Sequence, residues 1–67
     1  MDEDIFETDV TVLMHGEKAI QVTNGEVNAW IPYAVIDDDS EIHEKTPVGV
    51  TAILVIPIDL AEELGLA

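Results

Sequence analysis

The sequence predicts an α+β fold: an antiparallel sheet of about four strands with one short C-terminal helix. Three features indicate it, namely a continuous apolar run, an Asn-Gly pair between two alternating segments, and helix-ending residues near the C-terminus. No internal repeat or linker divides the chain, so we take residues 1–67 as a single domain. A chain of this length is near the minimum for a self-sufficient core. It has no cysteine, so aliphatic packing must supply the core, and dimerisation is the other possible source of burial.

The apolar run extends from Val48 to Ile58 and has no alternation of apolar and polar residues. A short run of this kind is typical of a strand covered on both faces, and a buried helix is the competing interpretation. β-Branched residues favour the strand, and the run contains Ile53, Val55 and Ile56.

The N-terminal part predicts a charged arm followed by a strand. In the arm, residues 1–7, we expect Ile5 and Phe6 to pack against the body while the carboxylates stay in water. Residues 9–15 then alternate, which predicts a strand with one face made by Val10, Val12 and Met14. A turn should follow, in which Gly16 permits a positive φ.

A β-hairpin is predicted around Asn24-Gly25, because this pair suits a two-residue type I′ turn. Such a turn places Thr23 opposite Glu26 and sorts the flanking residues onto two faces. The apolar face comprises Ile20, Val22, Val27, Ala29 and Ile31. Trp30 falls on the polar face, either as an anchor under the arm or helix or as a contact residue.

After the hairpin, Pro32 should end the pairing or mark an edge strand. Residues 33–36 should be extended or form a single turn, and residues 37–47 should form a polar loop. The final segment predicts a short helix. Asp59 is the expected N-cap, with Glu62 completing a capping box, and its buried face is expected from Leu60, Ala61 and Leu64. Gly65 should end the helix with Leu66 packing back.

The charge is the outlying property of the composition. Fifteen Asp and Glu residues oppose only Lys18 and Lys45, a formal net charge of −13, whereas a small domain usually has a net charge of magnitude ~2–8. This charge disfavours folding through self-repulsion and disfavours nucleic-acid binding, because phosphates are repelled. We therefore expect a basic protein partner. The alternative is a halophilic or simply very soluble protein.

Catalytic, cofactor and metal sites are not predicted. No nucleophile motif or phosphate loop is present. The acidic loop lacks the glycine and glutamate of an EF-hand, since Ile42 and Val48 occupy those positions. His15 and His43 do not form a metal-binding spacing. The apolar run is too short to span a membrane and the acidic start is unlike a signal peptide, so we expect a cytoplasmic protein.

The carboxylates occur in clusters, which suggests imitation of DNA phosphates. Rows of carboxylates on adjacent strands could match the charge density of duplex DNA, about one charge per 1.7 Å of axis, and would engage the cationic groove of a DNA-binding protein. The predicted partner-binding residues are Asp2, Glu3, Asp4, Glu7, Asp9, Glu26, Trp30, Asp37, Asp38, Asp39, Glu41 and Glu44.

About half of the chain resembles a family of small phage and prophage proteins. The similar segments are residues 18–22, residues 29–32 with Trp30-Ile31-Pro32, and the ending 56–66 with its Gly65-Leu66 close. The family has a tryptophan where this chain has Asp59, and it has no assigned chemistry. The resemblance implies a phage origin and a small β-rich body.

In size and acidity the chain is also similar to anti-CRISPR proteins that act as DNA mimics. That similarity implies a target in the infected bacterium, namely a DNA-binding subunit of a CRISPR effector complex at the surface that reads the protospacer-adjacent motif (PAM). The group shares no motif, so it assigns no residue. We expect the protein to be a monomer or a homodimer. The alternative function is that of a phage accessory or regulatory module whose hairpin edge adds a strand to a partner.

Overall fold

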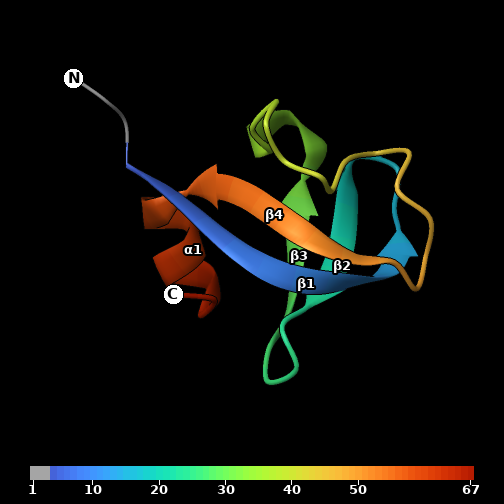
Figure 1. Ribbon diagram of the computed structural model, residues 1–67, viewed down its shortest axis with the longest axis horizontal. Helices are drawn as coiled ribbons and strands as arrows, with labels where there is room; N and C mark the ends of the chain where they lie inside the picture. The colour runs from blue at the N-terminus through green and yellow to red at the C-terminus, as the bar shows by residue number, and fades with distance from the viewer. Residues whose placement is uncertain (1–3) are drawn as a thin grey trace.

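The computed structural model describes residues 4–67; Asp2 and Glu3 of the predicted arm lie outside the described residues. The strands are β1 (Ile5–His15), β2 (Ala19–Thr23), β3 (Asn28–Pro32) and β4 (Thr51–Pro57), with a 3₁₀ helix η1 (Tyr33–Val35) and helix α1 (Ile58–Leu64). The sheet order is β3-β2-β1-β4 (Figure 1), and every neighbouring pair is antiparallel. The predicted α+β class is confirmed.

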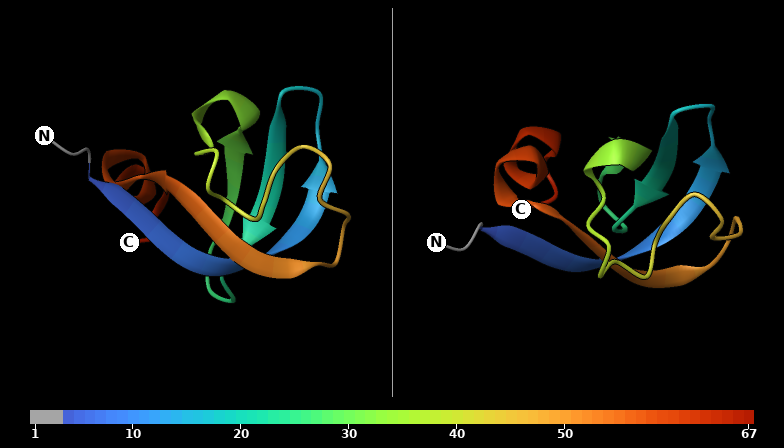
Figure 2. Two further views of the ribbon diagram at one scale, coloured as in Figure 1. Left: turned by 45° about the horizontal axis from the view of Figure 1, so that its top comes forward. Right: turned by 90° about the horizontal axis from the view of Figure 1, so that it is seen from above.

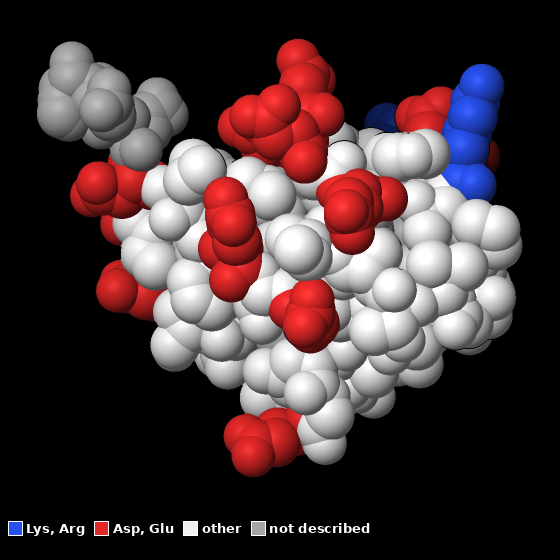
Figure 3. Space-filling model, viewed as in Figure 1, with Lys and Arg blue, Asp and Glu red and all other residues white. Residues whose placement is uncertain are grey.

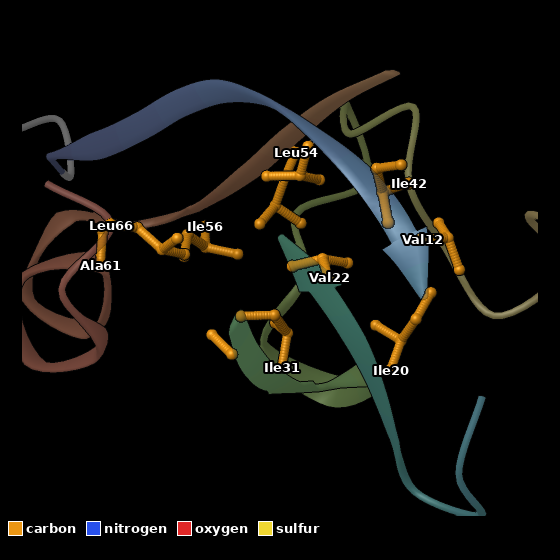
Figure 4. Packing of buried hydrophobic residues seen from close by; sticks show 11 residues of the cluster. Val12, Ile20, Val22, Ile31, Ile42, Leu54, Ile56, Ala61 and Leu66 are labelled. Carbon is orange, nitrogen blue, oxygen red and sulfur yellow. The ribbon is translucent and has the colours of Figure 1, made fainter. Parts of the chain in front are cut away.

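The sheet bends around its own core because β1 is long enough to pair with β4 along one part of its length and with β2 along the other. Residues 5–11 of β1 pair with β4, and residues 11–15 pair with β2. The buried side chains lie between the β1–β4 ribbon and the β2–β3 hairpin (Figure 4). Helix α1 closes one end on the same side (Figure 2). The core cluster is entirely aliphatic: Val10, Val12, Ile20, Val22, Ala29, Ile31, Ile42, Leu54, Ile56, Ala61 and Leu66.

The N-terminal strand is longer than the sequence predicted. Residues 5–7 belong to β1 and pair with β4 rather than forming an arm. Strand alternation then places Phe6 against the core, as expected, but turns Ile5 outward, where it is 46% exposed. The expectation that Ile5 is tucked against the body is therefore wrong.

A β-bulge lies between Val12 and Met14 in the pairing of β1 with β2. The extra residue reverses the alternation beyond it. Met14, predicted on the apolar face, is 52% exposed. His15 instead pairs with Ile20, whose side chain is fully buried, and so lies on the core side of the sheet.

The hairpin has a four-residue loop, not the predicted two-residue turn. Thr23 pairs with Asn28, not Glu26. Asn24 does not adopt the positive φ that a type I′ turn needs. Its Oδ1 instead accepts the N–H groups of Glu26 (2.9 Å) and Val27 (2.8 Å), so the side chain forms its own turn.

The predicted pairing was therefore wrong by two residues. The predicted faces of the hairpin residues are still correct, because side chains alternate between the two faces of a strand with a period of two. Four of the five predicted apolar positions are buried in the core. The fifth, Val27, lies in the loop and packs against the core. Pro32 ends β3, which is an edge strand, as predicted.

The apolar run forms β4 only over Thr51–Pro57, because residues 48–50 precede the strand and Ile58 begins α1. The prediction that both faces of this strand are covered is confirmed in part. Leu54 and Ile56 are buried in the core, and Val55 is buried on the opposite face. Ile53, on the same face as Val55, is 37% exposed. Gly16 lies in the predicted turn without a positive φ. A Cβ there would lie 3.1 Å from both Ala19 O and Trp30 Cζ3, so close approach is what requires glycine.

Helix α1 is confirmed, but its N-cap is not the predicted residue. Pro57 occupies the cap and makes no side-chain capping bond, whereas Asp59 lies within the first turn. The C-terminal prediction is correct. Gly65 is left-handed (φ 82°), and Leu66 is 7% exposed and donates its N–H to Ala61 O at 2.9 Å.

Candidate partner-binding surface

The acidic loop after η1 is docked along the outer edge of β4. Asp37 N donates to Val55 O and Glu41 N donates to Ile53 O, both at 2.9 Å. In return, Val55 N donates to Ser40 Oγ (3.1 Å), and Ile53 N donates to Glu41 Oε1 (3.1 Å). The loop therefore satisfies the backbone groups of this edge and closes it to further strand pairing.

Buried residues within the loop hold it in one conformation. Ile42 is fully buried in the core cluster, and Ser40 and Thr46 are buried polar residues. Ser40 Oγ accepts Ile42 N (3.1 Å), and Thr46 Oγ1 accepts His43 N (2.9 Å). The segment predicted as a polar loop is thus a loop, but one fixed by side-chain hydrogen bonds and an apolar anchor.

Docking of the loop brings separate carboxylate clusters together. Glu7 pairs with Val55, which is bonded to Asp37; Asp9 pairs with Ile53, which is bonded to Glu41. Each cross-strand row thus has a carboxylate residue on either side of a β4 aliphatic residue. We call the set formed by Glu7, Asp9, Asp37, Asp38, Asp39 and Glu41 the acidic face.

The dimensions of the acidic face follow from strand geometry. Glu7 and Asp9 are two residues apart on β1, which separates their Cα atoms by about 6.8 Å. The loop lies two strand spacings from β1, about 10 Å away. Acidic side chains are spread over the side of the molecule formed by β1 and β4, and basic side chains appear only at one corner (Figure 3). A shallow depression lined by Glu7, Thr8, Asp9 and Ile53 lies within it.

A cleft of about 310 Å³ adjoins the acidic face. Tyr33 and Ile36 line it with apolar surface, and Asp37, Asp38 and Glu44 add carboxylates; Ser40 and His43 complete it. A space of this kind can take a long aliphatic stem that ends in a cationic group.

Other predicted binding residues lie elsewhere. Glu26 is exposed in the loop between β2 and β3. Trp30 lies on β3, at the opposite edge of the sheet, with its ring against Gly16 and 43% exposed. It is therefore not the anchor under the helix that was one interpretation. Asp4 is exposed beside the start of α1, where its carbonyl accepts Ile58 N (3.1 Å).

The residues that fix the loop were not identified from the sequence as part of the surface. Ser40 and Thr46 lie in no recognisable sequence motif. Their hydrogen bonds fix the loop only in the folded arrangement, in which the loop lies along β4. Ile42 did carry a signal, because it is the only aliphatic side chain between Asp37 and Pro47. A lone apolar residue in a polar loop is a reasonable indication of an anchor.

Among residues 4–67, no three His, Asp or Glu side chains are grouped so that they could hold a metal ion. In the same part of the chain, no helix has the length and apolar character to cross a membrane. Comparison with known proteins gave no match to a family model, a curated protein or a solved structure.

Proposed function

We propose that this protein is a phage-encoded anti-CRISPR inhibitor that acts as a DNA mimic, with its acidic face occupying the PAM-binding site of a CRISPR effector subunit. The observation that carries the proposal is the pair of carboxylate lines on β1 and on the docked loop, in a chain with a net charge of −13. Phage origin and cytoplasmic action in the infected bacterium are parts of the proposal.

The spacing of the acidic face supports imitation of a duplex. Its two carboxylate lines, about 10 Å apart, fall between the widths of the minor groove (about 6 Å) and the major groove (about 12 Å) of B-DNA. Lysine and arginine side chains placed to grip phosphates on either side of a groove would meet carboxylates at similar separations. The negative field would also accelerate association with a cationic surface.

The fixed loop supports the same function through preorganisation. Binding costs free energy for each side chain or loop that must be ordered. Here Asp37 and Glu41 are already held on β4 by backbone hydrogen bonds, so little of that cost remains. The adjoining cleft would receive a lysine or arginine side chain of the partner, its stem against Tyr33 and Ile36.

The test is competition with PAM-containing duplex DNA for purified CRISPR effector complexes of different types. Glu7→Gln with Asp9→Asn removes two charges from the acidic face, and Glu62→Gln with Glu63→Gln removes two exposed charges from α1, on the other side of the sheet. We expect the first pair to raise the inhibitory concentration about tenfold or more, as loss of roughly 1.4 kcal/mol of binding would do, and the second pair to change it little.

Equal effects of the two pairs would show that only net charge matters and would remove the acidic face from the proposal. Failure of the parent protein to compete on any effector, in about 50 mM salt where electrostatic binding is strong, would refute the DNA-mimic function itself.

The alternative function, strand addition to a partner, is favoured by the outer edge of β3, which pairs with no further strand among residues 4–67. Tyr33 N donates to Lys18 O (3.0 Å) and Asn24 N to Val27 O (3.2 Å), on either side of the β2–β3 ladder. Hydrogen-bonded pairs alternate along an antiparallel ladder, so the backbone groups of Asn28 and Trp30 face away from β2. Under this alternative, Asn28→Pro would abolish binding and salt would have little effect.

A further inference from the structure

His15 connects three segments that are distant in the sequence. Its Nδ1 lies 2.8 Å from Tyr33 Oη at the start of η1, and its Nε2 lies 2.5 Å from Thr46 O at the end of the acidic loop. Tyr33 Oη also lies 3.1 Å from Gly16 O, in the turn after β1. The bulge in β1 creates this arrangement by turning His15 to the core side of the sheet.

The protons available to these contacts can be counted. The carbonyl oxygens of Thr46 and Gly16 can only accept hydrogen bonds. His15 Nε2 must therefore carry a proton and donate to Thr46 O, and the Tyr33 hydroxyl must donate its one hydrogen bond to Gly16 O. Tyr33 Oη is then an acceptor towards His15, and Nδ1 must carry a proton too. All three contacts are satisfied together only by the doubly protonated imidazolium ring.

Each neutral form of His15 loses one contact. With the proton on Nε2, Nδ1 becomes an acceptor, and the Tyr33 hydroxyl must donate its hydrogen bond to Nδ1. Gly16 O is then left without its donor. With the proton on Nδ1, the lone pair of Nε2 faces the carbonyl oxygen of Thr46. The second arrangement is repulsive, so loss of one proton must loosen either the turn at Gly16 or the end of the loop.

We propose that His15 is a proton-dependent lock that fastens the end of the acidic loop to β1 and η1. The ionisable and charged residues on the segments around it are Tyr33 on η1, Glu17 and Lys18 in the turn, and His43, Glu44 and Lys45 in the loop. The proposal does not depend on the DNA-mimic function.

The sign of the pH dependence follows from proton linkage. Only the doubly protonated ring makes all three bonds at once. Stability from the lock is therefore present while the ring carries both protons and is lost as pH rises and one of them leaves. Local opening of the loop at Thr46 should rise over the same interval.

The experiment uses the presence of only two histidines in the chain. Thermal unfolding is measured between about pH 5.5 and 8, the interval in which ordinary histidines titrate, for the parent, His15→Gln and His43→Gln. Over this interval we expect the parent and His43→Gln to lose about 5 °C or more in midpoint relative to His15→Gln, the shift expected for loss of one hydrogen bond.

Nitrogen-15 spectra of the imidazole rings in the parent protein provide a measurement that does not depend on a folded variant. We expect the His15 ring, held by its two hydrogen bonds, to show two protonated nitrogens at a pH where the exposed His43 ring shows one. Tyr33→Phe, which keeps the ring but removes the hydroxyl, should abolish this difference between the histidines. A neutral His15 ring in the folded parent at that pH, or an unchanged pH slope in His15→Gln, overturns the lock.

Discussion

Replacing Ile42 with alanine should cost a large part of the stability of the whole domain, although Ile42 lies in a loop. The side chain is fully buried between elements of the core. Truncation of a buried isoleucine to alanine typically costs about 2–5 kcal/mol through lost transfer energy and a residual cavity. The polar loop can collapse only partly, because hydrogen bonds hold it on β4, so we expect about 3 kcal/mol.

That loss is large relative to the total. At roughly 0.05–0.15 kcal/mol per residue, a domain of this size has only about 3–10 kcal/mol of stability. The midpoint of thermal unfolding should fall by about 12–24 °C, at roughly 4–8 °C per kcal/mol. Circular dichroism with urea and heat measures both quantities, and a loss of ellipticity already in buffer would be the extreme form of the same result.

Val48→Ala is the matched control, because Val48 is an apolar residue just beyond the same loop and is 60% exposed. It should change the free energy of unfolding by no more than about 0.5 kcal/mol. If Ile42→Ala is as mild as this control, Ile42 does not anchor the loop, and the fixed geometry of the acidic face loses its main support.

Three further changes test other parts of the structure. Ser40→Ala should cost about 1–3 kcal/mol in urea denaturation, because the buried Val55 N–H loses its acceptor; a cost near zero would mean that the loop does not cap β4. Gly65→Ala should cost about 1–2 kcal/mol, because the residue is left-handed at φ 82° and Val27 approaches no closer than 3.9 Å, so backbone strain alone acts; thermal unfolding measures it, and a neutral result refutes the left-handed cap. Gly16→Ala should cost about 1–3 kcal/mol by overpacking against Ala19 O and the Trp30 ring, and Trp30 fluorescence should shift; an unchanged spectrum and stability would contradict the contact.

Much of the sheet was predictable because alternation constrains faces more strongly than it constrains register. The hairpin prediction misplaced Thr23 by two residues, yet Val22 and Ile31 were assigned to the correct face. The Asn-Gly pair favoured a two-residue turn, and what overrode it was the Asn24 side chain, which bonds two backbone N–H groups. Such local competition between turn types cannot be resolved from residue identity alone.

Features that depend on distant contacts were not predictable. The bulge near Leu13 has no signature in the sequence, yet it exposes Met14 and brings His15 to Tyr33. The carboxylates of Glu7 and Glu41 belong to one surface only because both flank β4. The acidic clusters could be seen in the sequence, but which of them meet is decided by sheet order and by the docking of the loop.

The arrangement of the loop supports the proposed binding function over solubility alone as the explanation for the charge. A chain that needs acidity only for solubility gains nothing from holding its carboxylates in fixed positions, since a mobile loop would repel less. Here buried or bonded residues alternate with carboxylates: Ser40 and Ile42 lie next to Glu41, whose Oε1 bonds Ile53 N. Fixing like charges near each other opposes folding, and preorganised binding is the physical gain that would offset this cost. The same argument predicts that loosening the loop weakens binding without changing the charge. Ser40→Ala should therefore reduce competition with PAM-containing DNA while leaving the net charge at −13.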